Sequence, residues 1–198
     1  FEIPSFKFHT NLVGEFNVRN ALAVVACAKH FGLSNKQIQS AFETFRGIKR
    51  RMEIRGIIGG ITLIDDFGHH PTAIRETLAA LRVKYPSQKI WALFEPRSNT
   101  TRRNVFQNDF VGSFGNADAV VISQVARLEQ LNAGERLDPE KLVQDLKASG
   151  KDTTYLPDAD AIVTHMAKNA RGGDIVCVFS NGGFGGIHGK LLDRLGKR

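Results

Sequence analysis

The sequence predicts an α/β protein built on a doubly wound, mostly parallel sheet with an antiparallel edge strand. From Arg51 onward, apolar segments alternate with amphipathic segments of helical spacing, which is the order of a strand–helix–strand fold. Strand segments such as Ile90–Phe94 are apolar at every position, as expected of strands that helices cover on both faces. A Gly59-Gly60 turn joins the first two strand segments and predicts a hairpin. That hairpin supplies the antiparallel edge.

The individual elements follow one another along residues 51–198. The predicted strands are Met52–Ile58, Ile61–Asp65, Ile90–Phe94, Ala119–Ser123, Thr153–Leu156 and Asp174–Ser180. The predicted helices are Pro71–Lys84, Arg102–Phe114, Pro139–Ala148, Ala159–Ala170 and Ile187–Leu195. Two of these helices carry proline in their first turn, where the missing N–H breaks no helical hydrogen bond.

The first fifty residues have a different organisation. Phe6-Lys7-Phe8 alternates like a short strand within residues 2–9. A helix is expected from Phe16 to Phe31, because Gly32 is a natural stop. Ser34-Asn35-Lys36-Gln37 predicts a capping box that opens a second helix to about Phe45. A strand and two helices without a sheet to pack on do not make an independent domain, so this piece is interpreted as the end of a preceding domain.

The composition narrows the class of protein. The 198 residues are 42% hydrophobic and 24% charged, which suits a globular chain. There is no apolar run of the roughly 20 residues that span a bilayer and no secretory signal, so no membrane partner is expected. Cys27 and Cys177 lie far apart in apolar runs, which indicates reduced thiols and a cytoplasmic location. The chain begins with Phe1, and we interpret it as a fragment or a processed product.

The formal charge of +7 has two explanations. Nucleic-acid binding is one, but the sequence holds no helix-turn-helix, zinc-finger or aromatic RNA-binding signature. Binding of small, highly anionic ligands explains the excess equally well. We therefore expect no nucleic-acid partner.

The first loop with candidate chemistry is Asp65-Asp66-Phe67-Gly68-His69-His70-Pro71. It follows an apolar strand and precedes a helix, and ligands of open α/β sheets lie beyond such strand ends. A carboxylate here can accept hydrogen bonds from ribose hydroxyls, and a histidine at a helix start lies where anions collect. The alternative is structural: an aspartate caps the turn and a histidine is merely packed.

Two further loops follow later strands. Glu95-Pro96-Arg97-Ser98-Asn99-Thr100 offers a guanidinium, which matches carboxylates and phosphates. Ser180-Asn181-Gly182-Gly183-Phe184-Gly185-Gly186 is rich in glycine, which lets backbone approach a ligand closely. A tight strand-to-helix connection is the alternative for this loop. No G-x-x-x-x-G-K-[ST] phosphate loop occurs in the chain, and no metal-ligand set is predicted.

These motifs together resemble the Mur ligase family of bacterial cell-wall synthesis. Gly14-Glu15-Phe16-Asn17-Val18-Arg19-Asn20-Ala21-Leu22-Ala23 resembles its G-x-H-N-x-x-N-x-x-A segment, with Phe16 in place of His. Arg50-Arg51-Met52-Glu53 resembles the arginine that opens the family's C-terminal domain, and the Asp65–Pro71 loop resembles D-D-Y-G-H-H-P, with Phe67 in place of Tyr. The loops at Arg97 and Asn181 are most similar to those of the family's murein peptide ligase branch.

The resemblance implies a three-domain enzyme, of which residues 1–50 are the end of the central ATPase domain and 51–198 the C-terminal domain. It implies an ATP- and Mg²⁺-dependent ligase of peptidoglycan recycling, which joins the tripeptide L-Ala-γ-D-Glu-meso-diaminopimelate to UDP-N-acetylmuramate through an acyl phosphate. The fragment itself is expected to be inactive, since the phosphate loop lies upstream in the family. An L-alanine-adding ligase and a non-catalytic nucleotide- or peptide-binding module remain alternatives.

The family also implies residue roles. Asn17 and Asn20 would contact the adenine, Arg51 the phosphates and Asp66 the ribose. His69 would lie near the reacting phosphate. From loop position and charge, we expect four residues to hold the carboxylates of the peptide, namely Arg97, Ser98, Asn181 and His188. The replacements at Phe16 and Phe67 each remove a polar group.

Overall fold

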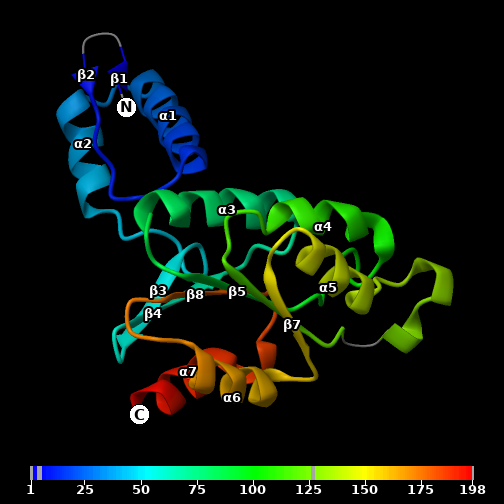
Figure 1. The fold of residues 1–198 in the computed structure, drawn as a ribbon. Helices are drawn as coiled ribbons and strands as arrows, with labels where there is room; N and C mark the ends of the chain where they lie inside the picture. Colours follow the sequence, from blue (N-terminus) through cyan, green and yellow to red (C-terminus); the bar gives the residue numbers. More distant parts are fainter. Residues whose placement is uncertain (1, 4–5, 126–127, 198) are drawn as a thin grey trace.

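A computed structural model describes residues 2–3, 6–125 and 128–197, and its centre is a six-stranded sheet (Figure 1). The strand order is β3-β4-β8-β5-β6-β7. The strands are β3 (Glu53–Ile58), β4 (Ile61–Asp66), β5 (Ile90–Phe94), β6 (Ala119–Ser123), β7 (Asp152–Leu156) and β8 (Ile175–Phe179). Among the described strands of this sheet, only the β3–β4 pair is antiparallel. The predicted mostly parallel sheet with an antiparallel edge is therefore confirmed.

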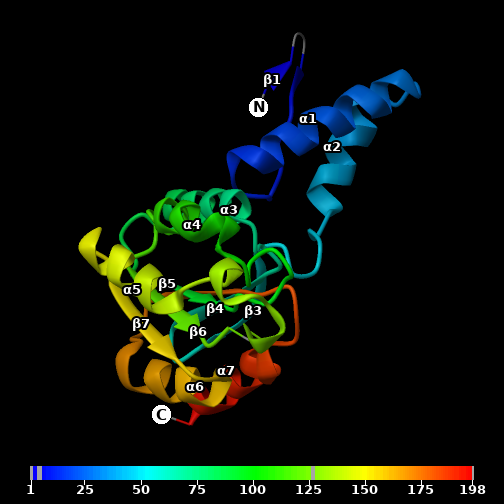
Figure 2. The same ribbon diagram turned by 90° about the vertical axis from the view of Figure 1, so that its right-hand side faces the viewer.

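Helices cover both faces of the sheet, as a doubly wound fold requires (Figures 1 and 2). One face packs against α3 (Pro71–Lys84), α4 (Gln107–Ser113) and α5 (Pro139–Ala148), and the other against α6 (Ala159–Asn169) and α7 (Ile187–Gly196). Short 3-10 helices lie at Asn104–Phe106, Leu128–Gln130, Ala133–Glu135 and Phe184–Gly186. The side chains of β4 alternate between the two cores, with Ile64 facing α3 and Leu63 facing α7.

A small helical unit at the N-terminus lies beyond α3 (Figure 2). It contains α1 (Glu15–His30) and α2 (Asn35–Thr44) beside the strands β1 (Glu2–Ile3) and β2 (Phe6–Lys7). Its core is small and consists of Phe8, Ala21, Val25, Ile38 and Phe42. Gly14 brings this unit against α3, because a Cβ at Gly14 would lie 2.7 Å from the Cβ of Ala80.

Most predicted elements are confirmed within two residues of their bounds, and the capping box of Ser34 with Gln37 is present. The short strand expected at Phe6-Lys7-Phe8 is confirmed as β2, but it is not alone: β1 pairs with it antiparallel, and each strand has two residues. Residues 4 and 5 lie outside the described residues. The helix expected from Arg102 is wrong at its start. Arg103 and Arg136 form an isolated antiparallel β-bridge, and Leu137 N–H donates to Arg102 O at 2.9 Å. The backbone at Arg103 therefore pairs with the segment at Arg136 before the helix begins.

Across the described ranges, no helix combines the length and apolar character needed to cross a bilayer.

Candidate functional site

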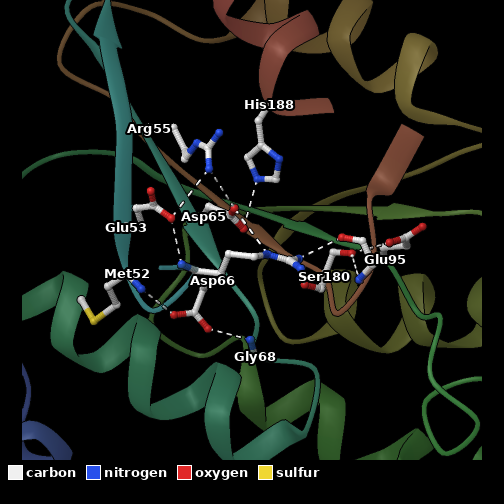
Figure 3. A network of polar contacts seen from close by, with 11 residues as sticks. Met52, Glu53, Arg55, Asp65, Asp66, Gly68, Glu95, Ser180 and His188 are labelled. Atoms are coloured by element: carbon white, nitrogen blue, oxygen red, sulfur yellow. Dashed lines mark hydrogen bonds and ion pairs between the residues drawn. The ribbon is translucent and has the colours of Figure 1, made fainter. Parts of the chain in front are cut away.

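The three loops singled out in the sequence follow three neighbouring strands. β8 lies between β4 and β5, and all three run parallel, so their carboxyl ends meet at one edge of the sheet. Ser180 ties these ends together: its N–H donates to Asp66 O at 3.2 Å and its hydroxyl donates to the carboxylate of Glu95. The three loops therefore begin side by side at this edge of the sheet (Figure 3).

The carboxylate of Asp66 stabilises the turn at the end of β4. Its Oδ1 accepts from Gly68 N–H at 2.7 Å, and its Oδ2 accepts from Met52 N–H at 2.9 Å. Burial raises the pKa of the Asp66 carboxyl, against the opposing effect of these two N–H donors. Each carboxylate oxygen has a further lone pair, so Asp66 can cap the turn and still accept a hydrogen bond from a ligand.

The backbone from Arg50 to Met52 adopts an uncommon conformation. Arg50 has φ 57° and Met52 has φ 51°, and each such non-glycine residue costs about 1–3 kcal/mol. Hydrogen bonds hold the bend in place: Arg50 N–H donates to Glu53 Oε2 at 2.8 Å, and Phe67 N–H donates to Arg50 O at 2.7 Å. As a result, the segment is fastened to both the first strand of the sheet and the Asp65–Pro71 loop.

This bend gives the two adjacent arginines different surroundings. The guanidinium of Arg50 donates to Ser180 O at 2.6 Å and to Gly182 O at 2.9 Å. Arg51 is exposed and lines a cavity instead. Both guanidinium carbons lie near the ring of Phe67, at 4.9 and 5.8 Å from its centroid, a range in which a cation is attracted to the ring. Phe67 thus makes its contacts without the hydroxyl that a tyrosine would bring.

A cavity of about 710 Å³ lies between the helical unit and α3. Its walls are largely apolar and include Phe16, Val24, Phe42, Phe45 and Ile48. All four residues predicted to bind nucleotide line it, namely Asn17, Asn20, Arg51 and Asp66. A pocket of this volume with apolar walls and a few polar groups suits a ligand of nucleotide size.

The two asparagines enter the cavity from one helix. Asn17 and Asn20 are three residues apart in α1 and therefore lie on the same side of it. The side-chain amide of Asn17 donates to Val13 O at 2.8 Å, whereas Asn20 is exposed. Asn20 is consequently the better placed of the two to contact a ligand.

The two histidines of the first loop have separate surroundings. His69 Nδ1 lies 3.1 Å from Phe67 O, and its ring packs edge-on against Phe67. His70 caps α3, because its Nδ1 accepts from Thr72 N–H at 3.2 Å, and it packs against Phe106. His70 thus fits the structural alternative, and His69 lies next to the group formed by Phe67 and the arginines.

Arg97 and the glycine-rich loop are in direct contact. A Cβ at Gly182 would lie 2.5 Å from Cδ of Arg97, so the arginine packs flat over this glycine. The Arg97 side chain is 49% exposed and pairs with Glu95 across 3.7 Å. Asn181 precedes Gly182 in the chain. The buried Oδ1 of Asn181 has no hydrogen-bond partner among the described residues. These two predicted peptide-binding residues therefore lie at one place.

The other two predicted peptide ligands already have partners. Ser98 Oγ accepts from Thr101 N–H at 3.1 Å and so caps its own loop. His188 Nε2 lies 3.2 Å from Asp65 Oδ1 (Figure 3). Burial lowers the pKa of His188, with the guanidiniums of Arg55 and Arg50 in the same direction and Asp65 opposing them. His188 thus belongs to the charge cluster around Asp65, on the α7 face of the sheet.

Sequence reasoning assigned no individual role to two carboxylates of this site, Asp65 and Glu95. Asp65 is buried, and its charge is compensated by Arg50 and Arg55 at 3.6 and 3.8 Å. Glu95 accepts the Ser180 hydroxyl at the strand ends. The signal that could have found Glu95 is its position: a carboxylate directly after a continuously apolar strand rarely lacks a partner.

A family model for Mur ligases, described as the glutamate ligase domain, matches residues 50–182. A UDP-N-acetylmuramate–L-alanyl-γ-D-glutamyl-meso-2,6-diaminoheptandioate ligase of Escherichia coli is 40% identical, over 95% of this chain and 39% of its own length. A UDP-N-acetylmuramate–L-alanine ligase of Variovorax paradoxus is 34% identical, over 96% of this chain and 41% of its own length.

A solved structure shows the same arrangement of elements. The murein peptide ligase of Psychrobacter arcticus superposes with a TM-score of 0.72 at 34% identity, over 96% of this chain and 39% of that one. The chain therefore spans about two fifths of the length of the relatives that it matches.

Proposed function

This chain belongs to the Mur ligase family, and on that premise we propose that it is part of an ATP-dependent ligase that joins a murein tripeptide to UDP-N-acetylmuramate. The tripeptide is L-Ala-γ-D-Glu-meso-diaminopimelate. The observation that carries this proposal is the 40% identity to the E. coli ligase named for these substrates. The contact between Arg97 and the glycine-rich loop supports it, because it places a cation beside a loop open to a peptide carboxylate.

The division into domains follows from the same premise. Residues 1–50 are the end of a central ATP-binding domain, and residues 51–198 are the C-terminal domain that receives the amine. The cavity between α1 and α3 supports this division, since it lies where the two parts meet.

In the proposed reaction, ATP phosphorylates the carboxylate of UDP-N-acetylmuramate and gives an acyl phosphate and ADP. The amino group of the tripeptide attacks the acyl carbon, the C–O bond to phosphate breaks, and the amine loses a proton. The products are the amide and inorganic phosphate. The chain contributes by positioning the reactants and neutralising their charge.

The nucleotide lies in the cavity between the helical unit and α3. Asn20 and Asn17 contact the adenine among apolar walls, and Asp66 accepts from the ribose. Arg51 reaches the phosphates, and His69 lies near the phosphate that reacts. Mg²⁺ would be held by the phosphates of ATP with one or two carboxylates, and it would neutralise part of the phosphate charge. The described residues bring no three His, Cys, Asp or Glu side chains together as a metal site of their own.

The carboxylates of the peptide lie where the loop that carries Arg97 meets the glycine-rich loop. Arg97 supplies the charge, and Asn181 offers its amide beside it. Ser98 and His188 support peptide binding indirectly. Ser98 accepts a hydrogen bond within its own loop and so fixes the shape of that loop, and His188 contacts Asp65.

A ligase that adds free L-alanine is the second candidate, because a relative with that name is 34% identical over nearly the whole chain. Phosphate release by the intact ligase distinguishes the two, measured with UDP-N-acetylmuramate, ATP and either amine. We expect a higher kcat/KM with the tripeptide. A higher kcat/KM with L-alanine would overturn the tripeptide assignment, and no release with either would overturn both.

A further inference from the structure

Arg50 connects three parts of the site that lie far apart in the sequence. Its Nη2 donates to Ser180 O at 2.6 Å and Gly182 O at 2.9 Å, and its Nε lies 3.6 Å from Asp65 Oδ2. Its guanidinium carbon lies 4.9 Å from the centre of the Phe67 ring. A single side chain thus contacts the glycine-rich loop and the Asp65–Pro71 loop at once.

The glycine-rich loop needs such an external restraint. Four of the residues from Ser180 to Gly186 are glycine, and glycine limits backbone conformation least of all residues. Gly185 and Gly186 have φ of 58° and 72°. The buried ring of Phe184 fixes the later part of the loop in the core. The earlier part, which carries Asn181, is held by the Ser180 hydroxyl and by Arg50.

The main chain of Arg50 is held in a fixed position relative to these carbonyls. Its backbone is fastened on both sides, through its N–H to Glu53 and its carbonyl to Phe67. A guanidinium also offers several donors in a fixed plane, so it can hold two carbonyls and stay beside a carboxylate. The strain at φ 57° is consistent with a residue that is held in place for its contacts.

We propose that Arg50 is a positioning residue, which holds the Ser180–Gly182 backbone in the form that presents Asn181 and Arg97 to the incoming peptide. This inference rests on the proposed function, in which these loops bind the peptide. Arg50 touches neither the peptide nor ATP and acts on binding through the loop.

Arg55 provides a matched control. Its Nη1 lies 3.8 Å from the same carboxylate of Asp65, and no hydrogen bond from Arg55 to the glycine-rich loop is present among the described residues. Arg55→Met therefore removes one positive charge from the cluster and leaves the loop carbonyls bonded. Arg50→Met removes one positive charge and also the hydrogen bonds to the loop carbonyls.

The experiment measures kcat and KM of the intact ligase for each substrate in wild type, Arg50→Met, Arg50→Lys and Arg55→Met. We expect Arg50→Met to raise the KM for the amine roughly tenfold or more, the usual effect of losing bonds from a charged donor. The KM for ATP should stay within about twofold, and Arg50→Lys should recover part of the loss because it keeps the charge without the planar fork. Equal changes in every KM, or an equal effect of Arg55→Met, would overturn the proposal.

Hydrogen exchange of the same proteins tests the loop without any turnover. Backbone amides of residues 181–183 should exchange faster in Arg50→Met than in wild type or Arg55→Met. Unchanged exchange would overturn the positioning role. Faster exchange with an unchanged KM for the amine would confirm that Arg50 holds the loop and would contradict the proposed peptide-binding function of the loop.

Discussion

Asp65 and Asp66 are adjacent in the chain, yet their carboxylates lie on opposite faces of the sheet. Asp65 faces α7 and contacts His188, whereas Asp66 lines the cavity beside α3. The alternation of side chains along β4 produces this separation. One aspartate therefore organises charges near the glycine-rich loop, and the other is available to a ligand in the cavity.

The first prediction follows from that separation. Asp66→Ala should weaken ATP binding to the intact ligase roughly tenfold or more, because a charged acceptor for the ribose is lost. Titration calorimetry measures the affinity, and a thermal melt shows whether the variant is folded. Asp65→Asn is the control, since Asp65 faces away from the cavity. An unchanged affinity in Asp66→Ala would rule out the ribose role.

The second prediction concerns the space under Arg97. Gly182→Ala adds a methyl group whose carbon would lie 2.5 Å from Cδ of Arg97, which is too close for both atoms to stay in place. Because the Arg97 side chain is half exposed, it can move out, so the melting temperature should change little. The KM for the amine should rise several-fold, as expected when one guanidinium–carboxylate bond is weakened.

Gly183→Ala is the matched control for this change. Apart from its two chain neighbours, no described residue has an atom within 4 Å of a Cβ at Gly183, and its φ of −85° suits any residue. This variant should bind the amine as wild type does. Equal behaviour of the two variants would show that the position of Arg97 does not matter for the peptide.

The sheet was largely predictable because its strands are short and separated by polar turns, and because strands such as β5 and β8 are apolar at every position. The end of each strand was predictable too, and with it the loops that carry Asp66, Arg97 and Asn181. The order of the strands was not, because pairing β8 between β4 and β5 is decided by packing between distant segments.

The directions of individual side chains were the least predictable part of the site. Arg50 and Arg51 are identical in type, and only the left-handed backbone at Arg50 and Met52 separates their roles. No glycine marks that bend. His188 Nε2 lies 3.2 Å from the buried carboxylate of Asp65, which is distant in the sequence, so its neighbours could not be predicted from its own segment. Such tertiary contacts leave no local signal.

The third prediction concerns the 198-residue chain by itself. It contains no G-x-x-x-x-G-K-[ST] loop to hold the phosphates of ATP. We therefore expect no phosphate release above the buffer background, with the intact ligase as a positive control. Circular dichroism of the isolated chain checks that it is folded in this assay. Phosphate release by the purified chain would contradict this prediction.

The fourth prediction concerns the dependence of stability on pH. Burial lowers the pKa of His188 in the folded chain below its ordinary value of about 6.5. Below that pH the unfolded chain binds a proton that the folded chain does not, so the free energy of unfolding should decrease as the pH falls. Above it, His188 is neutral in both states and its contribution is constant.

His188→Asn should therefore lose less stability than wild type between pH 7.5 and pH 5.5, as measured by urea unfolding. Part of the slope will remain, because burial also lowers the pKa of His165. The exposed residue His9 provides the control: His9→Asn should follow the wild-type curve. If His188→Asn also parallels wild type, then His188 is not held neutral beside Asp65, and the charge cluster on the α7 face must instead carry a protonated imidazole.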